Sequence, residues 1–93
     1  MTTLPTLLAL AQVLTPAGAP KPVGPYSPGI QAGDYVYVSG QGARSPADNK
    51  LPDTPEARVR QTLDNVKAIL AAAGLGLEHI VYSQVYLHES TPL

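Results

Sequence analysis

The sequence contains no cysteine, no tryptophan and no phenylalanine. Without cysteine, the chain can form no disulfide, no thiolate zinc site and no thiol nucleophile, which fits a reducing compartment such as the cytoplasm. Its six basic and seven acidic residues give a net charge of −1, with no run of like charge. An electrostatic footprint for nucleic acid is therefore not expected. With 93 residues, the chain is expected to form one small domain at most.

The first fourteen residues, MTTLPTLLALAQVL, include a short apolar run. No positively charged residue precedes this run, and it is too short to span a bilayer. We therefore interpret residues 1–12 as a short N-terminal extension and expect the domain to occupy residues 13–93. Neither a signal peptide nor a membrane segment is expected.

Turn-forming residues divide the next part of the chain. QVLT at 12–15 predicts a short first strand, and a proline-rich path then leads to SPGIQAGDYVYVSGQ. This stretch predicts a hairpin in which Ile30 begins one strand, Gly33 adopts positive φ in the turn, and YVYVSG forms the second strand. Alternation places one set of side chains on the same face of that second strand: Tyr35, Tyr37 and Ser39.

The segment DTPEARVRQTLDNVKAILAAAG predicts the longest element, a helix. Asp53 or Thr54 can cap its start, Pro55 suits its first turn, and Gly74 suits its end. Apolar residues recur at helical spacing and predict one buried stripe, made of Val59, Leu63, Val66, Ile69, Leu70 and Ala73. Asn65 is unfavourable inside a helix, and we expect it to bond a neighbouring loop rather than to take part in catalysis.

IVYSQVYLHE, residues 80–89, is rich in β-branched and aromatic residues and predicts a further strand. Because a helix connects it to YVYVSG, the two strands are expected to be parallel. The elements together predict an α+β unit of order β-β-α-β, with a helix on one sheet face and no obvious cover for the other. His79 and His88 lie at the two ends of this predicted strand, so they are not expected to share a metal ion.

Three separated motifs carry a resemblance to a known family. They are APKPVGPYSPGIQAGDYVYVSGQ, RQTLDNVKAILAAAG and IVYSQVYLHE, in this order. Over residues 13 to about 90, the chain resembles the RidA/YjgF family of enamine and imine deaminases, also labelled endoribonuclease L-PSP. The resemblance implies a chorismate-mutase-like α+β fold and a homotrimer whose sheets surround a central barrel. It also implies ligand clefts between subunits.

The resemblance further implies a cytoplasmic hydrolase of the 2-iminobutanoate/2-iminopropanoate deaminase type. Such an enzyme converts reactive imines and enamines of the 2-aminoacrylate class to 2-keto acids and ammonia, without a cofactor or a metal. Tyr26 matches the family's cleft-lining tyrosine, while Ser39 and Gly40 match the strand end where a hydroxyl and a backbone amide face the ligand. These three residues are the expected substrate-binding residues, and no catalytic residue is assigned.

In the family, a carboxylate-binding arginine and a water-positioning acidic residue lie on later segments. Both would fall after residue 93, so the chain is expected to be incomplete at its C-terminus. Arg44, Arg58 and Arg60 match the loop and the helix and are not assigned to that role. One alternative is a non-catalytic or chaperone-like member that binds small carboxylates. Another is a ribonuclease or translation inhibitor, which the balanced charge does not favour.

Overall fold

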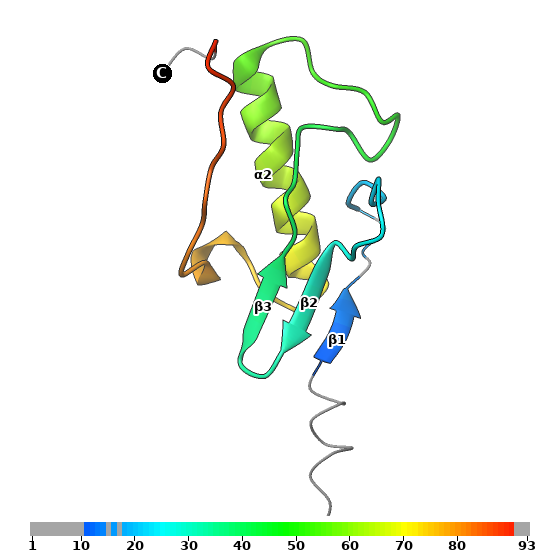
Figure 1. Ribbon diagram of the computed structural model, residues 1–93, viewed down its shortest axis with the longest axis vertical. Helices are drawn as coiled ribbons and strands as arrows, with labels where there is room; N and C mark the ends of the chain where they lie inside the picture. Colours follow the sequence, from blue (N-terminus) through cyan, green and yellow to red (C-terminus); the bar gives the residue numbers. More distant parts are fainter. Residues whose placement is uncertain (1–10, 15, 17, 91–93) are drawn as a thin grey trace, which may run out of the picture.

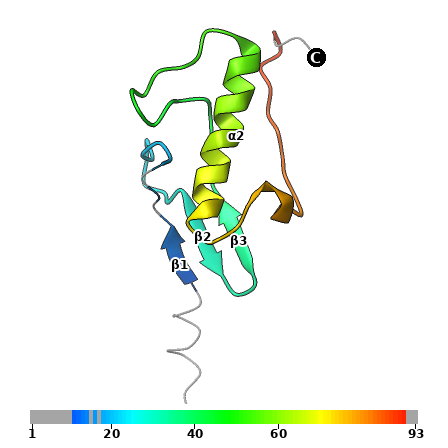
Figure 2. The same ribbon diagram turned by 180° about the vertical axis from the view of Figure 1, so that it is seen from behind.

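The computed structural model describes residues 11–14, 16 and 18–90. Its elements follow in the order β1 (Ala11–Leu14), β2 (Gly29–Ala32), β3 (Tyr35–Val38), α2 (Pro55–Ala71) and the 3-10 turn η1 (Leu77–His79). The strands form one antiparallel sheet in the order β1-β2-β3, and α2 lies against one face of it (Figures 1 and 2). The predicted α+β class is therefore confirmed. Most of the predicted N-terminal extension lies outside the described residues.

The hairpin of β2 and β3 has the predicted turn. Ala32 pairs with Tyr35, so Gly33 and Asp34 form a two-residue loop. Gly33 has φ of 59°, a conformation that costs glycine little and other residues more. On the other side of β2, Leu14 of β1 pairs with Gly29, which confirms the predicted first strand.

Alternation along β3 separates an open sheet face from a covered one. Tyr35 and Tyr37 are 59% and 60% exposed, and their rings lie 6.4 Å apart. Val36 and Val38 point to the opposite face and are half-buried, as expected for the face that α2 covers. The prediction that the tyrosines of β3 share one sheet face and the valines the other is confirmed.

The small core lies between the sheet and the C-terminal half of α2. Ile69 is fully buried, and Leu70 and Leu14 are 5% and 8% exposed. The stripe prediction is wrong for the N-terminal half of the helix, where Val59 and Leu63 are 56% and 48% exposed. The reason is length: the four-residue strands reach only the C-terminal part of the 17-residue helix (Figure 1).

Both ends of α2 follow the sequence signals. The side chain of Thr54 accepts a hydrogen bond from the amide of Ala57 at 3.1 Å, and Pro55 occupies the first turn. Beyond the last helical residue, Gly74 adopts φ of 76°. Within the described ranges, no helix has the length and the hydrophobicity that crossing a membrane requires.

The strand predicted over residues 80–89 does not form. This segment runs in an extended path on the β3 side of the molecule, alongside α2 (Figures 1 and 2). Among the described residues, no backbone hydrogen bond joins it to β3. Its large side chains are exposed on both faces, with Tyr82 and Val85 at 77% and 75%. Side-chain type favoured a strand, but a strand also needs a paired backbone and a covered face.

Candidate functional site

The first component of the site is the end of β3. The amide of Ser39 donates to the carbonyl of Pro28 at 2.9 Å, one step beyond the β2–β3 pairing. The Ser39 hydroxyl donates to the same carbonyl at 3.0 Å. The side-chain amide of Gln41 in turn donates to Ser39 Oγ and to its carbonyl, both at 3.3 Å. The Ser39 hydroxyl therefore ties two chain segments together and has its proton engaged within the protein.

The second component is the proline-rich segment that precedes β2. The amide of Tyr26 donates to the carbonyl of Gly24 at 2.8 Å, which makes a tight bend. The phenolic oxygen of Tyr26 accepts from the amide of Val23 at 3.4 Å. The ring lies over Gly24, with two ring carbons 3.5 Å from where a Cβ on that glycine would be. Tyr26 is thus held by its own bend, with 45% of its surface exposed.

These two segments border a cavity of about 230 Å³ that is open to solvent. Residues of the proline-rich segment form one wall, and residues that follow β3 form the other. The lining residues are Pro20, Lys21, Pro22, Val23, Tyr26, Pro28, Gly40, Gln41, Gly42 and Arg44. Two of the three predicted site residues, Tyr26 and Gly40, therefore lie on one cavity. Ser39 lies next to this lining and contacts it through Gln41.

Two glycines on the cavity wall are not required by the packing of the fold. A Cβ built on Gly40 or Gly42 meets no atom within 4 Å, and neither residue has positive φ. Gly29 is the contrasting case, because a Cβ there would lie 2.7 Å from Cγ2 of Ile69. At Gly40 and Gly42, the missing side chain leaves the main chain open to an approaching ligand.

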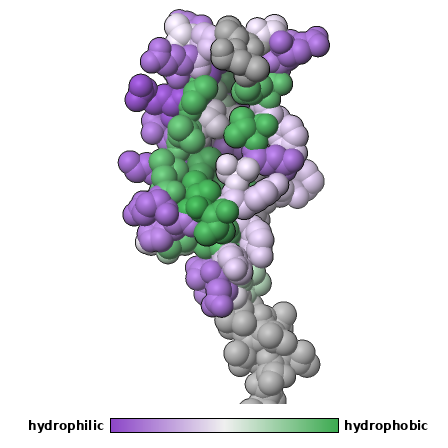
Figure 3. All heavy atoms as spheres, turned by 90° about the vertical axis from the view of Figure 1, so that its left-hand side faces the viewer, coloured by the Kyte–Doolittle hydropathy of each residue, from purple (hydrophilic) through white to green (hydrophobic). Residues whose placement is uncertain are grey.

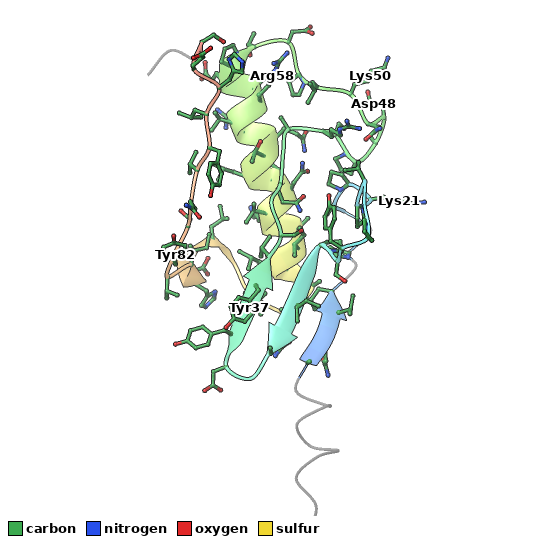
Figure 4. The ribbon with its side chains drawn as sticks, in the orientation of Figure 1. Lys21, Tyr37, Asp48, Lys50, Arg58 and Tyr82 are labelled. Atoms are coloured by element: carbon green, nitrogen blue, oxygen red, sulfur yellow. The ribbon has the colours of Figure 1, made fainter. Side chains whose placement is uncertain are left out.

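The charged residues of the lining are all basic. Lys21 and Arg44 line the cavity, and none of its other described lining residues is an aspartate or a glutamate. Neither forms an ion pair within the described residues, where the single close pair of opposite ionisable groups is Glu78 with His79 at 4.0 Å. Figure 4 shows the Lys21 side chain extending outward from its loop. A cavity with basic side chains and an accessible main chain suits a small anion.

A buried amide on α2 supports the wall that contains Gly40–Arg44. Asn65 is 1% exposed. Its Nδ2 donates to the carbonyls of Gly42 and Arg44 at 3.0 and 2.8 Å. Its Oδ1 accepts from Nε2 of Gln61 at 2.9 Å. The predicted loop contact of Asn65 is confirmed.

The site contains residues that the sequence reasoning did not assign. The sequence alone gives neither Arg44 nor Lys21 a role, because their place on one lining depends on how residues 20–28 fold against residues 40–44. No sequence pattern indicates the contact of Gln41 with Ser39. No group of three potential metal ligands occurs among the described residues.

A family model described as Endoribonuclease L-PSP matches residues 16–92. A RutC family protein of Saccharolobus solfataricus is 40% identical over 81 residues, which cover 86% of this chain and 64% of that protein. The 2-iminobutanoate/2-iminopropanoate deaminase of Escherichia coli is 36% identical over 80 residues, which cover 86% of this chain and 62% of the deaminase. The chain thus spans less than two thirds of the length of these curated relatives.

Solved structures give the same assignment. The YjgF gene product of Escherichia coli superposes with a TM-score of 0.69 at 39% identity, and TdcF of the same organism, solved with bound serine, does so at 0.69 and 36%. Each comparison covers 71% of this chain and 52% of the solved chain. The motifs, the strand order and these matches agree, and the protein belongs to the RidA/YjgF family, described as Endoribonuclease L-PSP.

Proposed function

We propose that the protein hydrolyses small 2-imino acids and their enamine tautomers to 2-keto acids and ammonia. The observation that carries the proposal is the cavity, in which the open main chain at Gly40 and Gly42 lies on the same lining as Arg44 and Lys21. The named deaminase among the relatives supplies the reaction class. The proposal therefore combines a site suited to a small anion with relatives that act on one.

The cavity suits a carboxylate in both size and chemistry. Its volume of about 230 Å³ is several times the ~30 Å³ that one water molecule occupies in the liquid. Glycine allows a carboxylate to approach the main chain closely, and the guanidinium of Arg44 offers paired donors for its two oxygens. The similar structure of TdcF contains serine, which is itself a small carboxylate.

The reaction needs little beyond positioning. An enamine first tautomerises to the imine, and water then adds to the imine carbon while the C=N electron pair moves to nitrogen and takes up a proton. The resulting carbinolamine expels ammonia, and its hydroxyl becomes the carbonyl of the keto acid. We assign to this chain the task of holding the carboxylate, so that the imine carbon faces water in a fixed orientation.

A second candidate is carboxylate binding without turnover. Its support is that the described lining contains no aspartate, glutamate or histidine to act as a general base. The Ser39 hydroxyl already donates to Pro28. The phenolic oxygen of Tyr26 is hydrogen-bonded to the amide of Val23. In this case the cavity would retain the keto acid or imine without accelerating hydrolysis.

We further propose that residues 13–93 act as one RidA-like domain, and that three copies assemble in the cytoplasm. The open sheet face with Tyr35 and Tyr37 supports an assembly, since such faces are normally covered. The exposed side chains of residues 80–87 give further support. They gather with hydrophobic side chains of α2 on the face drawn in Figure 3.

The test is the release of keto acid from 2-aminoacrylate, generated in place by a threonine dehydratase acting on serine. We expect the protein to accelerate release over buffer, Gly40→Val to abolish the acceleration, and Ala47→Val, which adds volume on an exposed loop outside the lining, to retain it. No acceleration, together with saturable binding of 2-oxobutanoate, would favour the second candidate. Neither activity nor binding from the folded protein would contradict both.

A further inference from the structure

Asn65 is the one polar side chain that is fully buried among the described residues, and it lies in the middle of α2. Asparagine is a poor residue for a helix interior, where its amide competes with the backbone for hydrogen bonds. Burying an amide also costs free energy unless its hydrogen bonds are satisfied. Asn65 therefore favours neither the helix nor the core, and the reason for its presence is to be found in the groups to which it is hydrogen-bonded.

The hydrogen bonds of Asn65 show where that role lies. Its two N–H groups donate to the carbonyls of Gly42 and Arg44, which are 23 and 21 residues away in the sequence. Gln61, one turn earlier on α2, donates to its oxygen. The side chain therefore joins the helix to the cavity wall through its two donors, and Gln61 satisfies its oxygen.

The wall has few other constraints. Among the described residues, the backbone of Gly40, Gly42 and Arg44 forms no other hydrogen bond to a helix or a strand. The next hydrogen bond along this loop joins the Ser45 amide to the carbonyl of Lys50. Two glycines in this stretch add conformational freedom. Without the bonds from Asn65, the wall would sample many arrangements, and a ligand would have to select one.

We propose that Asn65 is a positioning residue for the cavity. It acts from the buried side of the wall, and fixes the Gly40–Arg44 segment so that the open main chain and the Arg44 side chain stay on the lining. The proposal rests on the proposed function only for the identity of the ligand, a small 2-oxo or 2-imino acid.

The chain offers a matched set of variants. Asn65→Asp keeps the shape and the acceptor for Gln61 but removes both donors, and Asn65→Leu removes all three bonds. Gln61→Leu removes a hydrogen bond from the same amide but leaves both wall contacts in place. Thermal melts of each variant report whether the fold persists.

The first measurement is the binding of 2-oxobutanoate followed by NMR. We expect both Asn65 variants to raise the Kd roughly tenfold, and Gln61→Leu to change it less than about twofold. For Asn65→Asp, the loss relative to the parent protein should shrink as the pH is lowered, because a protonated carboxyl can again donate one hydrogen bond to the wall. Unchanged Kd values for both Asn65 variants, or an equal loss in Gln61→Leu, would overturn the proposal.

The second measurement needs no ligand. Limited trypsin digestion under native conditions reports cleavage after Arg44, and cleavage after Arg58 and Arg60 within α2 reports global unfolding. We expect the ratio of Arg44 cleavage to helix cleavage to rise at least about fivefold in Asn65→Asp and to stay near the parent value in Gln61→Leu. An unchanged ratio in Asn65→Asp would refute the positioning role, even if Asn65→Leu fails to fold. If the parent protein does not bind 2-oxobutanoate but the ratio rises, the ligand assignment fails and the positioning role stands.

Discussion

Cγ2 of Ile69 lies 2.7 Å from the place that a Cβ on Gly29 would occupy. Ile69 is fully buried, and Gly29 is the first residue of β2, so this contact is where α2 and the sheet approach each other. Only a residue without a side chain allows the helix to lie this close.

We expect Gly29→Ala to lower the free energy of unfolding by about 1–3 kcal/mol, since the added methyl group must displace Ile69 or the helix. Gly42→Ala is the matched control, because a Cβ there meets no atom within 4 Å. Chemical denaturation of both variants measures the difference. Equal stability of the two variants would show that the helix has room to shift.

The N-terminus of α2 gives a second prediction. Thr54→Ala removes the acceptor for the Ala57 amide and should lower the free energy of unfolding by about 1 kcal/mol. Asp53→Ala serves as the control, because Thr54 and not Asp53 caps the helix. Thermal melts compare the two, and a larger loss in Asp53→Ala would indicate that the cap shifts in solution.

The cationic lining gives a third prediction. Arg44→Gln should raise the Kd for 2-oxobutanoate about tenfold, the effect of losing one hydrogen bond to a charged group. Arg60→Gln removes the same charge from an exposed position of α2 outside this cavity and should leave the Kd within about twofold. The difference should decrease at high ionic strength, because salt screens the guanidinium at this exposed site. Titrations of both variants at two salt concentrations test this, and matching Kd values would remove Arg44 from the binding site.

The exposed C-terminal segment gives a fourth prediction. Val81 and Val85 are 83% and 75% exposed, which is unusual for side chains of this kind in an isolated molecule. We expect the protein to self-associate, and Val85→Asp to shift the population toward monomer. Ala47→Asp adds the same charge on an exposed loop and should not do so. Sedimentation velocity at several concentrations measures the shift, and a monodisperse monomer of the parent protein would contradict the prediction.

The elements that the sequence predicted well depend on local chemistry. Gly33 between two alternating strands defines the hairpin, and Thr54, Pro55 and Gly74 delimit the helix within a few residues of each signal. Their preferences arise from backbone conformation and from hydrogen bonds to near neighbours. The exposed Val59 shows what periodicity does not predict, namely which part of an apolar helical stripe is buried. That depends on how far the opposing sheet extends along the helix.

The site also combines features that a local pattern predicts with features that depend on contacts between distant segments. The family resemblance identified Tyr26 and Gly40, which the fold brings onto one cavity. It did not identify Arg44, whose place depends on two segments that meet only in the folded chain. Residues 80–89 have the composition of a strand, but strand formation depends on a partner that no local pattern contains.

The placement of the tyrosines makes the protein its own optical probe. Without tryptophan, its near-ultraviolet emission comes from five tyrosines, and Tyr26 is the one that lines the cavity. Tyr35 and Tyr37 lie on the open sheet face, while Tyr82 and Tyr86 lie on the C-terminal segment. Replacing these four leaves a single fluorophore whose intensity responds to what enters the cavity. Ligand screening then needs no dye and no coupled enzyme.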